Sequence, residues 1–121
     1  MSSYHTEPQE IQSGDCSGEL LNATRKIKGA VSSGGQEHFY LEPQVATAIP
    51  AADGGLEIRT SAQGTEYVRE PLARILGRPI GTIDVTGTPL GGAFGGKVLI
   101  VEPIVAAAAI AIDRPVRLAL T

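Results

Sequence analysis

The chain has 121 residues, of which 42% are hydrophobic and 19% are charged, so it is one globular domain or part of one rather than a disordered polyelectrolyte. Its net charge of −3, with no basic cluster, gives no reason to expect a nucleic-acid partner. Cys16 is the only cysteine, which excludes an internal disulfide framework and a cysteine-based metal site.

Residues 1–23 are predicted to form a polar arm or linker, because they carry mainly Ser, Gln, Glu, Pro and Gly and few apolar side chains. Within this arm we expect one helical turn, at residues 19–22. The N-terminus has no apolar stretch of the kind that a signal peptide carries. We therefore expect a cytoplasmic protein, with a periplasmic location as the alternative.

Five short stretches show the alternation of apolar and polar residues, or the flanking turn signals, that are typical of β-strands. They are residues 24–32, 44–50, 56–61, 80–86 and 115–120. Asp53-Gly54-Gly55 separates the second and third stretches and favours a hairpin turn between them.

The first predicted helix covers residues 65–76, where apolar side chains recur at helical spacing. Thr65 is a candidate N-cap, and Gly77 is placed to end the helix. Pro71 leaves two alternatives open. It either kinks this helix or occupies the first position of a shorter helix that starts near Glu70.

The second predicted helix lies within residues 98–112, with Pro103 in its first turn and residues 106–109 in its body. It is too short, and too broken by Glu102-Pro103, to span a bilayer, which takes roughly 20 apolar residues. Because it is apolar all round, we expect it to be buried on every side, and a single layer of short strands cannot do this. Short strands with two helices give an α+β or mixed α/β class, and the uncovered helix indicates a partial domain of something larger.

Residues 91–97, Gly-Gly-Ala-Phe-Gly-Gly-Lys, hold four glycines in seven positions. Such a loop lets bare backbone approach a ligand, and its N–H groups favour an anion, so we read it as part of a site for a phosphate-bearing cofactor. The alternative is a mobile glycine-rich turn. The loop also fits G-x-x-x-x-G-K, but Val98 stands where a P-loop needs Ser or Thr for magnesium, so a nucleotide-binding role is disfavoured.

Residues 36–43, Gln-Glu-His-Phe-Tyr-Leu-Glu-Pro, form the second unusual stretch. Phe39, Tyr40 and Phe94 are three of only five aromatic residues in the chain, and all three fall in the two unusual stretches. This concentration favours a site there. His38 is interpreted as a packed histidine rather than a ligand, because Glu37 points to the other face of any strand.

Four stretches, taken together, resemble a known family in their order and spacing. They are residues 34–43, 60–63 (Thr-Ser-Ala-Gln), 91–97 and 114–117 (Arg-Pro-Val-Arg). The family is the molybdenum-binding large subunit of the xanthine dehydrogenase and aldehyde oxidase enzymes, the molybdenum hydroxylases. The resemblance implies that residues 24–121 are a fragment of a molybdopterin-binding domain. It also implies an oxidoreductase that places a hydroxyl from water on an aldehyde or heteroaromatic carbon.

The resemblance further implies roles for individual residues. Gln36 is similar to the glutamine whose amide hydrogen-bonds an oxo group on molybdenum, and Phe94 to the loop residue whose backbone N–H faces the metal centre. The neighbouring small residues Gly92, Ala93, Gly95 and Gly96 are expected to let backbone approach the cofactor, a molybdopterin or its cytosine dinucleotide. Lys97 is expected mainly to support the loop, and Glu42 to be a structural acid.

Val98 departs from the xanthine dehydrogenase pattern, which tends to have a glutamate at this position. A valine cannot hydrogen-bond a polar purine, so we expect a substrate pocket that accepts aldehydes or apolar heterocycles. The family's general-base glutamate is expected beyond Thr121, and no catalytic residue is assigned in this chain.

The resemblance implies, as partners, the remainder of the large subunit and iron–sulfur and flavin (FAD) modules. Such a cluster is not expected in this chain, because one cysteine cannot hold it. The isolated chain is expected to be inactive and to self-associate through uncovered apolar surface. A non-catalytic structural or assembly fragment is the alternative.

Overall fold

The structure is a computed structural model that describes residues 9–121 of the chain. The chain divides into two compact units, residues Met1–Gly35 and residues Gln36–Thr121. In the first unit, the described part contains one short helix, α1 (Cys16–Asn22). Asp15 caps it by accepting a hydrogen bond from the Gly18 backbone N–H at 2.9 Å. The predicted helical turn is confirmed, and it begins three residues earlier than expected.

The predicted strand at residues 24–32 is wrong, because the structure assigns no strand there. Ile27 and Val31, whose alternation suggested it, are each 98% exposed. A strand needs a neighbour to pair with its backbone groups, and alternation in the sequence does not supply one.

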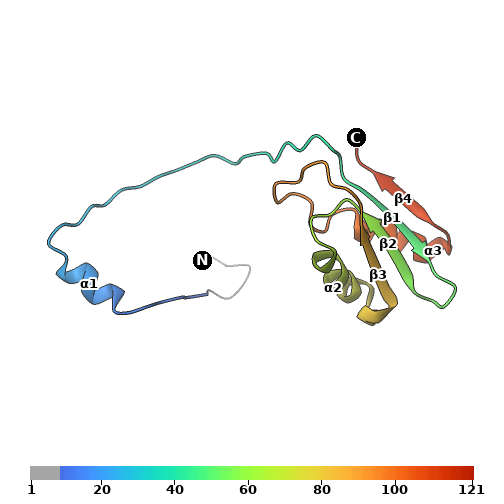
Figure 1. Cartoon of the computed structure of the whole chain (residues 1–121), viewed down its shortest axis with the longest axis horizontal. Helices are drawn as coiled ribbons and strands as arrows, with labels where there is room; N and C mark the ends of the chain where they lie inside the picture. The colour runs from blue at the N-terminus through green and yellow to red at the C-terminus, as the bar shows by residue number, and fades with distance from the viewer. Residues whose placement is uncertain (1–8) are drawn as a thin grey trace. The chain divides into compact units, whose positions relative to one another are not determined.

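The second unit is built on a four-stranded mixed sheet in the order β3-β2-β1-β4 (Figure 1). The strands are β1 (Val45–Pro50), β2 (Leu56–Thr60), β3 (Ile83–Gly87) and β4 (Val116–Ala119). β1 pairs antiparallel with both β2 and β4, whereas β2 pairs parallel with β3 through a helical crossover. Four predicted strands are thereby confirmed. The one expected at 80–86 begins at Ile83, because Ile80–Thr82 form a 3₁₀ turn, η1.

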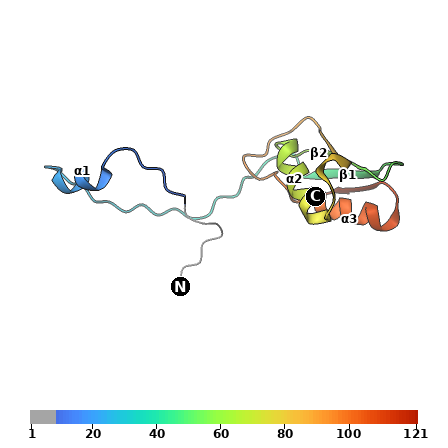
Figure 2. The same cartoon turned by 90° about the horizontal axis from the view of Figure 1, so that it is seen from below.

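One face of the sheet carries the core. Ala46, Ala48 and Ile58 on the two central strands are fully buried, whereas the alternate positions are only partly covered or exposed. Both helices of this unit contribute to the same hydrophobic cluster, so both lie on this face. Figure 2 shows α3 (Glu102–Ile112) running along one side of the strands. The predicted α+β class is confirmed.

Helix α2 (Thr65–Leu76) connects β2 to β3. It runs unbroken through Pro71, so the alternative of a shorter helix starting near Glu70 is wrong. Gly64, rather than Thr65, is the N-cap, and no side chain caps this end. Gly77 ends the helix as predicted: it adopts the left-handed conformation with φ of 62°, which glycine enters at little cost.

Helix α3 begins with Glu102, with Pro103 in the first turn as predicted. Val105, Ala106 and Ala109 face the core and are fully buried. The expectation that a single layer of strands cannot bury this helix on every side is confirmed, because Ile104 is 58% exposed and Ile112 is 57% exposed. The single sheet covers one side of the helix and leaves the other open.

Among the described residues, no helix is both long enough and apolar enough to cross a membrane.

Replacing Ile58 by alanine should lower the free energy of unfolding of the second unit by roughly 2–5 kcal/mol, because the side chain is fully buried at the centre of the sheet. Ile75→Ala is the matched control, since Ile75 on α2 is 58% exposed and its truncation should change stability by less than about 0.5 kcal/mol. Denaturant unfolding of the two variants measures both effects. Equal losses would contradict the placement of the core.

Candidate functional site

Two segments far apart in the sequence meet beside the carboxyl end of β3. We call residues 91–97 the glycine loop and residues 36–43 the aromatic segment. The backbone N–H of Gly91 donates a hydrogen bond to Glu42 Oε2 at 2.9 Å. A Cβ built on Gly96 would lie 2.9 Å from Tyr40 Cε1 and 3.0 Å from His38 Cγ. The aromatic segment therefore occupies the space of a side chain at position 96, and the loop can approach it only as bare backbone.

An ion pair joins the same two segments. Lys97 Nζ lies 2.6 Å from Glu42 Oε2, and the lysine side chain is only 1% exposed. Its ammonium also lies 4.8 Å from the centroid of the Tyr40 ring, in a cation–π arrangement. The expectations that Lys97 supports the loop and that Glu42 is a structural acid are confirmed, because each has the other as partner.

The hydrogen bond from Lys97, and then that from the Gly91 N–H, lower the pKa of Glu42 below its ordinary value. The carboxylate is consequently charged throughout the neutral range. A lowered pKa also keeps the pair intact in mildly acidic solution, and the pair is lost only as the pH falls through that lowered value.

Two glutamines complete the hold on the loop. Gln63, just after β2, accepts hydrogen bonds at Oε1 from the backbone N–H groups of Gly95 (2.9 Å) and Lys97 (3.4 Å). Its own N–H donates to the Lys97 carbonyl at 2.8 Å. Gln44 is buried, and its amide donates to the Gly96 carbonyl at 3.2 Å and to the Tyr40 hydroxyl at 2.6 Å. Sequence reasoning assigned no role to either glutamine, although Gln63 ends one of the four motif stretches.

The loop's N–H groups divide into two sets. Those of Gly91, Gly95 and Lys97 donate to side chains, and that of Gly96 donates to the Ala93 carbonyl at 2.8 Å. Among the described residues, the three consecutive N–H groups at 92–94 have no hydrogen-bond acceptor. Consecutive N–H groups without acceptors are available to donate to an anion or a partly negative oxygen, although Ala93 in the middle is itself only 3% exposed.

The conformation of the loop keeps these donors in one place at a cost in local strain. Gly92 and Gly95 have φ of 96° and 92°, which glycine tolerates. Phe94 lies between them with φ of 51°, a left-handed conformation that residues with a Cβ adopt uncommonly. Phe94 is 74% exposed, so packing of its side chain within this chain does little to offset the strain.

The other residues predicted for the site lie on open surface. Gln36 is exposed in coil, and no hydrogen bond joins its side chain to another described residue. Val98, immediately after the loop, is 40% exposed. His38 lies beside Gly96, but its side chain is 45% exposed and its Nδ1 lies 3.9 Å from Glu37 Oε1. The interpretation of His38 as a packed histidine, with Glu37 pointing to the other face, is therefore wrong. The structure thus brings the glycine loop together with His38, Tyr40, Glu42 and Gln44, and among the described residues no hydrogen bond joins Gln36 to the loop.

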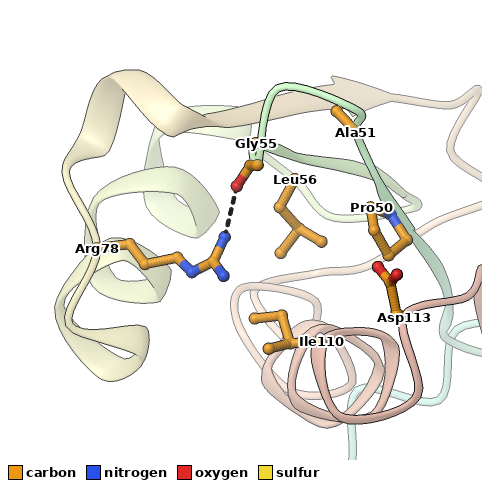
Figure 3. Close-up of a pocket in the computed structure, with 8 residues that line it drawn as sticks. Pro50, Ala51, Gly55, Leu56, Arg78, Ile110 and Asp113 are labelled. Carbon is orange, nitrogen blue, oxygen red and sulfur yellow. Dashed lines mark hydrogen bonds between the residues drawn. The ribbon is translucent and has the colours of Figure 1, made fainter.

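Within residues 9–121 there is no cluster of three or more His, Cys, Asp or Glu side chains that could hold a metal ion. A small cavity of about 90 Å³ lies elsewhere in the unit, between the β1–β2 turn and the end of α3 (Figure 3). Arg78 closes one side of it by donating a hydrogen bond to the Gly54 carbonyl at 2.9 Å. It shares no lining residue with the glycine loop or the aromatic segment.

A protein-family model described as a molybdopterin cofactor-binding domain matches residues 2–121. The chain is 38% identical over 108 residues to indole-3-acetaldehyde oxidase of Arabidopsis thaliana, which covers 86% of this chain and 8% of that protein. It is 36% identical to aldehyde oxidase 1 of Cavia porcellus and 35% identical to xanthine dehydrogenase/oxidase of Mus musculus, in each case over 95% of this chain and 9% of the relative. The chain therefore spans less than a tenth of the length of these relatives.

Two solved structures contain a similar fold. Quinoline 2-oxidoreductase from Pseudomonas putida 86 superposes with a TM-score of 0.72 at 25% identity, over 87% of this chain and 14% of that one. Reconstituted CO dehydrogenase from Oligotropha carboxidovorans superposes with a TM-score of 0.65, also at 25% identity, over 69% of this chain and 11% of that one.

Replacing Gly96 by alanine should destabilise the unit by roughly 1–3 kcal/mol, because the new methyl group overlaps the Tyr40 ring, which Gln44 and Lys97 hold in place. Gly81→Ala is the control, since a Cβ there meets nothing within 4 Å, and its effect should be neutral or stabilising by up to about 1 kcal/mol. Thermal unfolding distinguishes them. A neutral Gly96→Ala would show that the two segments do not pack as described.

Proposed function

Because the chain belongs to the molybdopterin cofactor-binding domain family, we propose that it forms part of a molybdenum hydroxylase that oxidises aldehydes or heteroaromatic carbons with water as the oxygen source. The family predicted from the motif stretches is confirmed by the match over residues 2–121. Similarity to aldehyde oxidases and to a xanthine dehydrogenase/oxidase supports this reaction class. The comparisons do not favour the alternatives of a non-catalytic fragment or a nucleotide-binding loop.

One observation carries the proposal: three adjacent backbone N–H groups, at residues 92–94, without acceptors among the described residues. These groups are neutral donors at fixed positions, and they suit the oxo and phosphate oxygens of a molybdopterin cofactor without adding charge. Close packing at Gly96 supports the same conclusion, because Tyr40 and His38 leave no room for a side chain there and the loop backbone lies directly against them. The residues present therefore fit the cofactor that the family implies.

The chain's contribution to the reaction is binding and orientation. The molybdenum cofactor, when bound, supplies the two-electron oxidation of the substrate carbon. The backbone N–H groups of Phe94 and its two predecessors would donate hydrogen bonds to cofactor oxygens, and the small side chains of the loop would keep the approach open. The Gln36 amide would be a further donor to the cofactor.

Val98 sets the preferred substrate class. It directly follows the loop and is 40% exposed, so its methyl groups present an apolar surface beside the donors. A polar purine would lose hydrogen bonds to water there without replacing them, whereas an aromatic aldehyde or an apolar heterocycle would not.

The remaining parts of the site and of the electron-transfer chain lie in other segments. We assign the general base to the remainder of the large subunit, and electron transfer to iron–sulfur and FAD modules, in a cytoplasmic enzyme. The open side of α3, with Ile104 and Ile112 more than half exposed, supports contact with the remainder of the subunit. Without that cover, the isolated chain self-associates.

In the complete enzyme that contains this chain, elemental analysis should find about one molybdenum per copy, together with oxidation of an aromatic aldehyde. The isolated 121-residue chain, which lacks the general base and the redox modules, should not turn over. A complete enzyme that is folded but contains no molybdenum would contradict the proposed function.

Replacing Val98 by glutamate in the complete enzyme should lower kcat/KM for an apolar aromatic aldehyde by about tenfold or more, because it places a charge where an apolar substrate binds. The ratio of kcat/KM for xanthine to that for the aldehyde should rise correspondingly. Val98→Ala is the control, because it keeps the surface apolar and should retain the aldehyde preference. An unchanged ratio in the glutamate variant would place the substrate away from residue 98.

A further inference from the structure

The glycine loop is held at two points that flank its free donors. On one side, Glu42 accepts the Gly91 N–H at 2.9 Å and pairs with Lys97. On the other side, Gln63 accepts the Gly95 N–H at 2.9 Å. The three N–H groups without acceptors lie between these two points. The hydrogen bonds thus bind the ends of the turn and leave the N–H groups of its middle without acceptors among the described residues.

The first attachment of the loop, at Glu42, depends on a single carboxylate oxygen. Glu42 Oε2 accepts both the Gly91 N–H and the Lys97 ammonium, so the same atom fixes the beginning and the end of the loop. Lys97 is 1% exposed and its ammonium has no second carboxylate partner among the described residues. Removing the Glu42 carboxylate therefore leaves a buried cation without its counter-ion, which favours a displaced loop.

The second attachment of the loop, at Gln63, depends on a neutral hydrogen-bond acceptor rather than on a charged group. The Gln63 side-chain oxygen takes two N–H groups of the loop, and the Gln63 backbone N–H donates to the Lys97 carbonyl. The backbone bond survives any substitution at position 63, whereas the side-chain bonds need an oxygen at this position. A glutamate keeps that oxygen, and a methionine of similar length has no comparable acceptor.

Neither residue belongs to the hydrophobic cluster that stabilises the unit. Gln63 is exposed, and Glu42 is 32% exposed. Their substitution should accordingly change the loop while the sheet and its core persist. This separates a role in holding the loop from a general role in folding.

We infer that Glu42 and Gln63 are positioning residues, which by holding Gly91 and Gly95 direct the N–H groups of residues 92–94 toward a single oxygen-rich ligand. That this ligand is the molybdenum cofactor rests on the proposed function. The attachment of the loop by Glu42 and Gln63 is independent of that proposal, because it is formed by residues of this chain alone.

Amide hydrogen exchange of the 121-residue chain tests the hold. Glu42→Leu removes both acceptor oxygens and should speed exchange in the peptide that contains residues 91–97 by about tenfold, because the lost hydrogen bonds are charge-assisted. Exchange in β1 and β2 should not change. Glu42→Gln keeps one neutral acceptor and should give a smaller effect.

Glu70→Leu is the matched control. It removes a carboxylate from another ion pair, with Arg74 at 2.8 Å, in which both side chains are well exposed on α2. Loop exchange in this variant should equal that of the wild type. If Glu42→Leu and Glu70→Leu give the same loop exchange, or if Glu42→Leu speeds exchange uniformly through the unit, the inference is overturned.

The molybdenum content of the complete enzyme tests whether the held loop serves the cofactor. Gln63→Met should lower the molybdenum found per chain by about tenfold, and Gln63→Glu, which keeps the acceptor, should restore most of it. A loosened loop with unchanged molybdenum content would overturn the positioning role while the proposed function stands. A wild-type enzyme without molybdenum would instead contradict the proposed function, and the exchange comparison would then decide whether the two residues hold the loop.

Discussion

The ion pair between Glu42 and Lys97 connects two segments that lie 55 residues apart, and the candidate site exists only because they meet. A pair with one partner 1% exposed is costly to form, since both charges lose water. This pair recovers that cost through close geometry: a contact of 2.6 Å, a second hydrogen bond from Gly91 and the face of Tyr40 against the ammonium. The charge of Lys97 is thereby neutralised by Glu42, and only neutral backbone N–H groups of the loop are left to bind a ligand.

The same contact explains the composition of the loop. Packing against Tyr40 and His38 excludes a side chain at Gly96, and the left-handed turns at Gly92 and Gly95 suit glycine. Phe94 is the exception, because it is a non-glycine residue in a left-handed conformation with a ring that gains little burial here. Strain that local packing does not offset is characteristic of binding sites, where the ligand or a neighbouring segment compensates for it.

Much of this arrangement could be predicted from the sequence, and the failures have identifiable causes. Strands β1 and β2 were predictable because alternation coincides with a Gly-rich hairpin turn, and the end of α2 because Gly77 follows a helical stripe. The strand at 24–32 failed because alternation does not supply a pairing partner. The sequence left open whether α2 continues through Pro71, because proline disfavours a helix interior but tertiary packing can override this local preference. The helix does continue through it.

For the candidate site, the sequence could identify the glycine loop and the structural character of Lys97 but not which of the loop's N–H groups remain free. That division depends on acceptors supplied by Glu42 and Gln63, which no local pattern places near residue 91 or residue 95. The motif containing Gln63 was recognisable only as part of a resemblance. Hydrogen-bond partners of this kind become visible once the fold brings distant segments together.

The exposure of Phe94 and Val98 follows from the same construction. A site for a small molecule usually buries most of its ligand, and it does so with walls from several elements. Here one wall is present: the loop lies against the aromatic segment and is hydrogen-bonded to Gln63, while Phe94 and Val98 are 74% and 40% exposed. The relatives are more than ten times longer than this chain, so in them other segments are available to form the facing walls. This wall does not need the ligand to form, because the Glu42–Lys97 ion pair and the hydrogen bonds from Gly91 and Gly95 join residues of this chain alone.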